Sequence, residues 1–372
     1  MNYCEDVLLS QPIHHVDLNE DVLFEILSHA DIQSVFQLCQ VNKTICHQYD
    51  DLFQHIYDRF YHETGMSVFK NKTTKMTWFQ LLKLCYQLSR LFLLLPSLKK
   101  YTMKALYTMK TLDLSNQNIK VLPPEIGQLI HLKKLSLYNN QLSALPPEIG
   151  QLINLQKLSL YNNQLSALPP EIGQLYHLQR LSLYNNKLSA LPPEIDQLIN
   201  LKYLNLYYNK LNVFPSEIGQ LSALKYLNLS TTQLSALPSE IGQLRALQEL
   251  NLSSNQLSAL PPEIGQLGAL KQLYLSDNQL SALPPEIGQM RALQKLYLSN
   301  NKLSALPPEM GQMSALQYLY LDHNQLNALP NEIGQLRALQ YLNVMNNKLS
   351  STVKYDLKQQ LPYTTNYPTF LV

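Results

Sequence analysis

Three kinds of side chain in this sequence could support catalysis or metal binding: a repeated glutamate, four cysteines and nine histidines. The glutamates recur from Glu125 to Glu332 at one position of a proline-rich turn, so we predict a solvated ladder rather than paired catalytic carboxylates. The histidines do not gather at metal-ligand spacing, and the sequence has no glycine-rich phosphate loop or nucleophile motif. We therefore expect no enzymatic activity, no metal and no cofactor.

The glutamates belong to a frame of 23 residues that recurs through about two-thirds of the chain. Its skeleton is Leu-x-x-Leu-x-Leu-x-x-Asn-x-Leu-x-x-Leu-Pro-x-x-Ile-Gly-x-Leu. A fixed period of this length is typical of a solenoid, in which no single repeat can bury its own apolar face. The skeleton resembles the leucine-rich repeat. This resemblance implies an α/β solenoid, a horseshoe with a parallel β-sheet on its concave face. Repeats 1 to 10 begin at Met109, Leu132, Leu155, Leu178, Leu201, Leu224, Leu247, Leu270, Leu293 and Leu316, and a partial repeat 11 begins at Leu339.

Within each repeat, the Leu-x-Leu step predicts a short strand whose two leucines point inward. Eleven strands at ~4.8 Å spacing would make a sheet roughly 50 Å long, enough to hold a folded partner. The asparagine after the strand, Asn140 in repeat 2, is expected to bond main-chain groups of its own turn and the next. Gln117 and Thr232 replace it in repeats 1 and 6. Because threonine has fewer hydrogen-bonding atoms, we predict a weaker ladder around residues 228–236.

Nine of the eleven glycines fill another column of the frame, from Gly127 to Gly334. Such a column suggests a backbone conformation that is costly for other residues. Asp196 is the one substitution inside the column, and aspartate tolerates left-handed backbone better than most residues. The prolines before the column restrict the convex side to a turn or a single helical turn.

The exposed strand positions vary between repeats, whereas the core and convex positions are nearly identical copies. Twelve of the 23 tyrosines, Tyr208 included, are expected on the concave face, and tyrosine is enriched at protein interfaces. Duplication is the alternative explanation, but copying alone does not move tyrosines between strand positions. A basic column near the amino-terminal end predicts a partner with some acidic surface, while Asp322 and His323 lie near the other end. The predicted partner-binding residues are Lys134, Tyr138, Lys157, Tyr161, Arg180, Tyr184, Tyr203, Tyr207, Tyr226, Tyr274, Tyr297, Tyr318, Tyr320 and Tyr341.

Short amphipathic helices are predicted before residue 60, with caps at Asn19, Asp31 and Asp50. Their order resembles an F-box over residues 16 to about 56. The pattern falls on Leu18-Asn19, Glu25-Ile26-Leu27, Ala30-Asp31, Val41-Asn42 and Leu52-Phe53, with Asn19, Ala30 and Phe53 in place of the usual Pro, Leu and Trp. The resemblance implies helix-in-groove docking to the adaptor of a Skp–cullin–F-box ubiquitin ligase. The implied contacts are Leu18, Leu23, Ile26, Leu27, Val35, Leu38 and Val41. Alternatively, the same side chains form the private core of a helical cap.

We expect five segments: a polar tail over 1–15, the F-box-like domain over 16–60, a helical linker and N-terminal cap over 61–108, the solenoid over 109–350, and a C-terminal cap over 351–372. Residues 1–60 carry ten acidic and two basic side chains, whereas residues 61–108 carry one and eight, which suggests a boundary near Tyr61. A helix predicted between Thr77 and Leu95, ending at Pro96, has an apolar stripe that we expect to cover the first repeat. The stripe consists of Trp78, Leu81, Leu82, Cys85, Leu88, Leu91, Phe92 and Leu95.

Together, the two resemblances imply the substrate-recognition subunit of a Skp–cullin–F-box ubiquitin ligase. The alternative is an intracellular leucine-rich repeat scaffold, linked to signalling or small GTPases, without ubiquitin chemistry. The four cysteines, Cys4, Cys39, Cys46 and Cys85, all precede the repeats and form no CxxC pair, and the first 30 residues carry no basic residue. We therefore expect a reduced, cytoplasmic protein, in the host cytosol if its source is a virus or a bacterium. The net charge of +2 gives no argument for nucleic acid or membrane.

Overall fold

A computed structural model describes residues 84, 87–88, 90–101, 103–351 and 370–371. The chain divides into two compact units, residues 1–106 and 107–372. The F-box-like segment over 16–60, with its seven adaptor contacts from Leu18 to Val41, lies outside the described residues. Docking to an adaptor therefore stays a prediction.

Of the helix predicted between Thr77 and Leu95, the structure describes residues 84, 87–88 and 90–94 as helical. Leu84, Leu88 and Leu91 are buried. Leu88 and Leu91 belong to the predicted apolar stripe, so the stripe is confirmed where the structure describes it. A 3-10 helix, η1 (Pro96–Lys100), begins at the proline that was expected to end the long helix. The short helix α7 (Met103–Thr108) contains the boundary between the two compact units.

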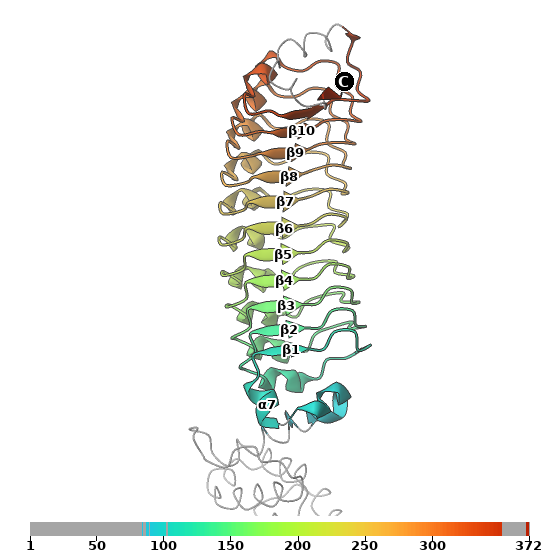
Figure 1. The fold of residues 1–372 in the computed structure, drawn as a ribbon, viewed down its shortest axis with the longest axis vertical. Coiled ribbons are helices and arrows are strands. Elements are labelled where there is room, and N and C mark those ends of the chain that lie inside the picture. The colour runs from blue at the N-terminus through green and yellow to red at the C-terminus, as the bar shows by residue number, and fades with distance from the viewer. Residues whose placement is uncertain (1–83, 85–86, 89, 102, 352–369, 372) are drawn as a thin grey trace, which may run out of the picture. The chain divides into compact units, whose positions relative to one another are not determined.

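The second compact unit is the expected solenoid: each repeat contributes one three-residue strand to a single parallel sheet, in sequence order (Figure 1). The register advances by one repeat at each step, with Leu135 opposite Leu158 and Leu158 opposite Leu181. The strands are β1 (Thr111–Asp113), β2 (Lys134–Ser136), β3 (Lys157–Ser159), β4 (Arg180–Ser182), β5 (Tyr203–Asn205), β6 (Tyr226–Asn228), β7 (Glu249–Asn251), β8 (Gln272–Tyr274), β9 (Lys295–Tyr297), β10 (Tyr318–Tyr320) and β11 (Tyr341–Asn343).

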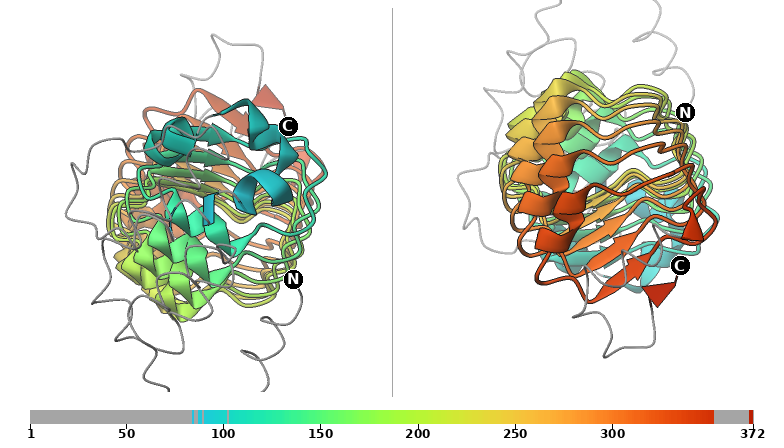
Figure 2. Two further views of the ribbon diagram at one scale, coloured as in Figure 1. Left: turned by 90° about the horizontal axis from the view of Figure 1, so that it is seen from below. Right: turned by 90° about the horizontal axis from the view of Figure 1, so that it is seen from above.

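A five-residue 3-10 helix follows most strands and lies away from the sheet, on another side of the stack (Figure 2). The proline-rich turn was predicted to allow no more than one helical turn, and this is confirmed. These helices are η2 (Pro124–Gln128), η3 (Pro147–Gln151), η4 (Pro170–Gln174), η5 (Pro193–Gln197), η6 (Ser216–Gln220), η7 (Ser239–Gln243), η8 (Pro262–Gln266), η9 (Pro285–Gln289), η10 (Pro308–Gln312) and η11 (Asn331–Gln335).

The core of the solenoid is made of the repeated leucines and isoleucines. In repeat 2, Leu135, Leu137, Leu142 and Ile149 are all buried, and the same positions are buried in the repeats on either side. Each fully buried side chain of this type contributes roughly 1.5–3 kcal/mol. At the far end, β12 (Phe370–Leu371) pairs parallel to β11 and covers backbone groups of that strand that would otherwise form an open edge.

The interior asparagine ladder is confirmed, with one correction to its direction. Asn163 accepts a hydrogen bond from the Leu142 amide at 3.0 Å through Oδ1. Its Nδ2 donates to the carbonyls of Leu137 and Leu160, each at 2.9 Å. The asparagine therefore bonds its own turn and the preceding turn, not the next one, because the carbonyls left without a strand partner belong to those two turns.

The interpretation of the glycine column is wrong. None of these glycines has left-handed backbone, and neither has Asp196. A Cβ on Gly150 would lie 2.7 Å from the Glu171 carbonyl oxygen, so the column is needed for the close approach of successive 3-10 helices. Where Asp196 replaces the glycine, a hollow of about 570 Å³ lies along η5, η6 and η7, lined in part by Asp196, Ser216 and Glu240.

The glutamate column is also less solvated than predicted. Glu125 is 5% exposed, and the later glutamates of the column are half-buried. The reason is the glycine column: the Cβ atom of Glu171 lies 2.9 Å from where a Cβ on Gly150 would stand. The stem of each glutamate thus packs against the preceding repeat, and only part of the side chain reaches water.

Candidate partner-binding face

Three columns of side chains form the outer surface of the strands, which we call the sheet face. The first column starts at Lys134 and the second at Ser136, at the two ends of β2. The third starts at Tyr138, two residues after the strand. The register repeats these positions in every strand, so residues of one column lie beside each other in neighbouring repeats.

The first tyrosine stack occupies the third column over repeats 2 to 4. The ring centroids of Tyr138 and Tyr161 are 4.5 Å apart, with 7° between the ring planes. Tyr161 and Tyr184 are 4.4 Å apart at 9°. These ring spacings are close to the distance between neighbouring strands, so the strand spacing of the sheet determines the spacing of the stacked rings. Because each ring covers the face of the next, the stack presents ring edges and hydroxyls outward.

A second stack occupies the first column over repeats 5 and 6. Tyr203 and Tyr226 are 4.4 Å apart at 7°. The guanidinium of Arg180 lies 4.3 Å from the ring centre of Tyr203, a cation–π contact that joins the basic column to this stack. Tyr207 extends the third column beside it and is exposed. We call these six tyrosines, Tyr138, Tyr161, Tyr184, Tyr203, Tyr207 and Tyr226, the N-terminal patch.

A third stack occupies the second column over repeats 8 to 10. Tyr274 and Tyr297, and then Tyr297 and Tyr320, are each 4.6 Å apart. Tyr341, in the first column, contacts the end of this stack with a tilted ring, 4.7 Å from Tyr320 at 35°. In the first column, the Lys295 ammonium lies 5.5 Å from the ring centre of Tyr318. We call Tyr274, Tyr297, Tyr318, Tyr320 and Tyr341 the C-terminal patch.

Repeat 7 separates the two patches with polar side chains. Its three sheet-face positions hold Glu249, Asn251 and Ser253. Burial raises the pKa of the Glu249 carboxyl, and the positive charge of Lys295 opposes that rise. The sheet face therefore has two aromatic patches with a polar gap between them.

The stacks also hold their hydroxyls in the protonated form. Burial, followed by the neighbouring Tyr184 and Tyr138 phenols, raises the pKa of Tyr161 to about 12. Burial and the Glu249 carboxylate raise the pKa of Tyr274 to about 12. Both phenols are therefore protonated at neutral pH, and the Tyr274 hydroxyl donates to Gln272 Oε1 at 2.6 Å within the sheet face.

The charged positions divide along the solenoid. Lys134 and Lys157 are exposed neighbours in the first column, as predicted. At the other end, Asp322 is engaged within the solenoid, because it accepts hydrogen bonds from Ser299 at 2.7 Å and from Asn343 at 3.0 Å. His323 Nδ1 lies 3.0 Å from the other Asp322 oxygen. The charges available to a partner are therefore mainly the basic ones of the early repeats.

Tyr208 does not belong to the sheet face, which corrects the prediction. It follows the third column and has left-handed backbone, with φ at 56°. The same position is left-handed in repeats 1 to 11, as in Asn139 and Asn162. Sequence reasoning missed this column, although the repeated Asn-Asn pair was a usable signal, since asparagine is enriched in left-handed backbone.

In the described part of the chain, no group of three or more His, Cys, Asp and Glu side chains could hold a metal ion. Over the same residues, each helix is too short or too polar to cross a lipid bilayer.

The repeats match known family models. A model described as "leucine-rich repeat region" matches residues 148–224, 209–278 and 265–361, and one described as "leucine rich repeat" matches residues 107–165. Neither match includes residues 16–60. No curated protein matches the chain.

Solved structures are similar over the repeats. A leucine-rich repeat protein of Leptospira interrogans, LIC12759, is 35% identical; the match covers 71% of this chain and 97% of that one, with a TM-score of 0.48. A TDR receptor is 28% identical over 65% of this chain and 39% of that one, with a TM-score of 0.53. The PEPR1–AtPEP1 structure is 31% identical over 64% and 42%, with a TM-score of 0.51. The chain thus spans less than half of either receptor chain.

Proposed function

Because the chain belongs to the leucine-rich repeat family, we propose that it is a binding scaffold that holds a protein partner on the sheet face. The three tyrosine stacks are the observation that carries this proposal. They present a large, rigid surface with apolar ring edges and polar hydroxyl tips, the type of surface that is enriched at protein interfaces. Since the sheet already fixes the rings, little side-chain freedom is lost when a partner binds.

The charge of the sheet face supports a partner with acidic surface near the early repeats. Lys134 and Lys157 stand beside the N-terminal patch, and Arg180 lies over Tyr203 at its centre. The proposed partner places acidic groups over this column and apolar groups over the tyrosines. A partner that contacts both patches would also cover the polar gap at repeat 7, which lies between them.

Capture from eukaryotic cell extract tests the sheet face directly. The full chain and a Tyr161→Ser, Tyr297→Ser variant serve as baits, with Tyr176→Ser as the matched control. Tyr176 is also an exposed tyrosine, but it lies outside the three columns. We expect the double variant to lose the captured partner at least tenfold and the control to retain it, as scored by quantitative mass spectrometry. Equal capture by all three baits would reject the sheet face as the binding surface.

We further propose that the partner is a target for ubiquitin transfer, and that this chain is the substrate-recognition subunit of a Skp–cullin–F-box ligase. The support is the order of features over residues 16–56, followed by repeats with a variable binding face. In this role the chain supplies two contacts and no catalytic residue: Leu23, Ile26 and Leu27 dock the adaptor, and the sheet face holds the target.

Isothermal titration of the full chain with purified Skp-type adaptor tests this second step. Replacing Leu23, Ile26 and Leu27 with aspartate is expected to abolish adaptor binding, while the Tyr161→Ser, Tyr297→Ser variant binds the adaptor normally. If the wild-type chain does not bind the adaptor but still captures its partner, the alternative is correct: a scaffold without ubiquitin chemistry.

A further inference from the structure

The turn edge of the solenoid changes at repeats 5 to 7, and three neighbouring columns of side chains change together. The left-handed column carries Asn, Asp or His in the other repeats but Tyr208, Thr231 and Ser254 here. In repeats 1 to 4 its asparagines bond each other in a row, with Asn162 donating to Asn139 and Asn185 donating to Asn162 at 2.9 Å. At Tyr208, Thr231 and Ser254 the structure has no such bonds.

The interior column changes at Thr232. In repeat 5, Asn209 Oδ1 accepts from the Leu188 amide at 3.0 Å. In repeat 6, the shorter Thr232 side chain does not bond the Leu211 amide, because its hydroxyl donates to the Leu229 carbonyl at 2.7 Å and lies 3.0 Å from Asn255 Oδ1. Instead, the Thr232 amide itself donates to Asn255 Oδ1 at 3.1 Å, and the following residue, Gln233, takes left-handed backbone with φ at 73°.

This turn leaves two backbone donors without acceptors. In the neighbouring repeats, the Lys210 amide donates to the Leu188 carbonyl at 2.9 Å and the Gln256 amide to the Leu234 carbonyl at 2.8 Å. Within the described residues, the amides of Gln233 and Leu211 have no such partner. Leu211 is buried and Gln233 is exposed, so the Gln233 amide is the one that an acceptor from outside the chain can reach.

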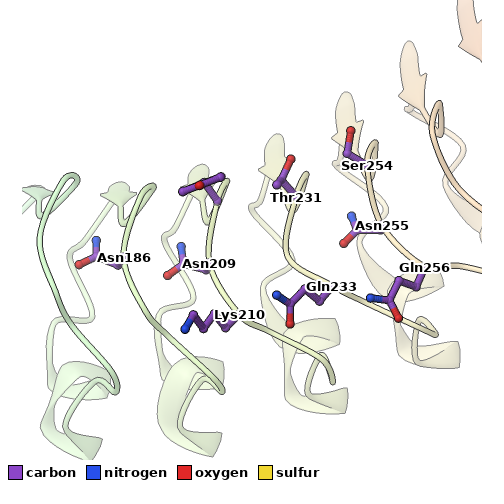
Figure 3. Close-up of a pocket in the computed structure, with 9 residues that line it drawn as sticks. Asn186, Asn209, Lys210, Thr231, Gln233, Ser254, Asn255 and Gln256 are labelled. Atoms are coloured by element: carbon purple, nitrogen blue, oxygen red, sulfur yellow. The ribbon is translucent and has the colours of Figure 1, made fainter.

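The third column holds the side chains of Lys210, Gln233 and Gln256, which project from successive turns in one row (Figure 3). Elsewhere in this column the side chains pair, as Lys187 does with Gln164 and Lys302 with Gln279, both at 3.2 Å. Lys210, Gln233 and Gln256 make no such pair. Together with the left-handed column they line a hollow of about 390 Å³.

We propose that this hollow is a binding site for an oxyanion, the oxygens of a phosphate or of a carboxylate. Lys210 is its single charged lining residue, and the hydroxyls and amides that can donate hydrogen bonds there belong to Tyr208, Thr231, Gln233, Ser254 and Gln256. The lining asparagines already donate to main-chain carbonyls, as Asn209 does to Leu183 and Leu206. A cation would find no carboxylate in the lining. An oxyanion would gain a charge-assisted contact with Lys210 and a hydrogen bond from the Gln233 amide. The site lies on the turn edge and is independent of the sheet face.

The backbone at the hollow is strained at Thr231 and Tyr208, so these two side chains do not stabilise the fold as asparagine would. A β-branched threonine and a tyrosine are unusual in left-handed backbone, yet Thr231 and Tyr208 adopt it with φ of 54° and 56°. Asparagine, which serves in the preceding repeats, would cost less at both positions. Such strain gathers where a local arrangement serves binding.

Backbone NMR of the full chain tests the site with two probes, inorganic phosphate and acetate. We expect a saturable shift of the Gln233 and Leu211 amides with at least one probe. Saturation by phosphate identifies a phosphate-bearing ligand, and saturation by acetate alone identifies a carboxylate. Two variants must weaken it: Lys210→Ala by about tenfold or more, and Thr232→Asn, which restores the internal acceptor, to no detectable binding. Lys302→Ala is the matched control and is expected to bind like the wild type.

The opposite results overturn the proposal. It fails if neither probe gives a saturable shift, or if Thr232→Asn binds as the wild type does. Thr232→Asn is expected to fold, because it introduces the residue that nine other repeats carry at this position. A rise in Tm for this variant would verify that the internal ladder has been restored.

Discussion

The interior asparagine shows how one residue type governs the local backbone of this solenoid. Where it is present, one side chain serves three or four main-chain groups of two turns, as Asn163 does. Where it is replaced, in repeats 1 and 6, the next residue becomes left-handed: Asn118 has φ at 56° and Gln233 at 73°. In both cases the asparagine of the following repeat accepts the amide instead, Asn140 for Gln117 and Asn255 for Thr232.

Hydrogen exchange measures this difference at single amides. We predict faster exchange at Leu211 and Gln233 than at Leu188 and Lys210, because only the latter pair has acceptors. Thr232→Asn should slow exchange at Leu211 and Gln233 and leave more distant turns unchanged. Equal rates across these turns in the wild type would contradict the prediction.

The stacked tyrosines give a pH prediction at the same scale. The pKa of Tyr161 and of Tyr274 is raised to about 12 from the ordinary value of 10.0. A raised folded-state pKa means that the protonated phenol is favoured by folding, so this contribution is complete below pH 10 and is lost as the pH rises toward 12. Ultraviolet titration should show tyrosines that ionise about two pH units late. Tyr161→Phe and Tyr274→Phe should each remove part of that late absorbance, and an unchanged late phase in both variants would refute the assignment.

At the scale of the element, three-residue strands and five-residue 3-10 helices are too short to be stable alone. Each is held by its copies in the neighbouring repeats, through the parallel register on one side and the close approach of glycine and glutamate on the other. The spacing of the 3-10 helices therefore depends on the absence of a side chain at the glycine column.

Two glycine-to-alanine substitutions test whether the glycine column is needed for close approach or only for backbone flexibility. A Cβ on Gly219 would lie 2.6 Å from Gln243 Oε1 and 2.9 Å from the Glu240 carbonyl oxygen, whereas a Cβ on Gly268 would meet nothing nearer than 4.0 Å. We predict that Gly219→Ala destabilises the protein by about 1–3 kcal/mol in urea denaturation. Gly268→Ala should be neutral or stabilising by up to about 1 kcal/mol. Similar losses for both variants would show that close approach is not the reason for the column.

At the scale of the whole solenoid, the sheet aligns the exposed side chains of all repeats into one long surface whose two ends differ in charge. Basic side chains and the N-terminal patch come first, then the polar gap at repeat 7, then the C-terminal patch. Near that patch, Asp322 is already engaged by Ser299. A partner bound along this surface should therefore depend on charge at one end more than at the other.

Salt dependence tests this polarity once a partner has been captured. We predict that Lys134→Glu with Lys157→Glu weakens partner binding and reduces its sensitivity to ionic strength, since the early column supplies the long-range attraction. Lys202→Glu with Lys225→Glu makes a matched charge change on two exposed lysines outside the sheet face. The prediction fails if the control variant weakens binding as much as the double variant does.

The sequence by itself determined the solenoid, its strands, its short convex helices and its asparagine ladder. These follow from the spacing of leucine, asparagine and proline within one repeat, because each local choice is copied at the same period and must satisfy the same neighbours. The order of the tyrosine columns was also visible in the sequence. The adaptor-binding helices remain a prediction from the sequence alone.

Only the tertiary structure decided what depends on the distance between repeats. It showed that the glycines are needed for close approach, that the glutamate stems pack against them, and that Tyr208 leaves the sheet face. It also showed that Tyr208, Thr231 and Ser254 line one hollow with Lys210 and Gln233. The physical reason is that a contact between residues 21 to 46 positions apart depends on how the sheet stacks the repeats, and the sheet fixes that spacing only when all repeats are folded together.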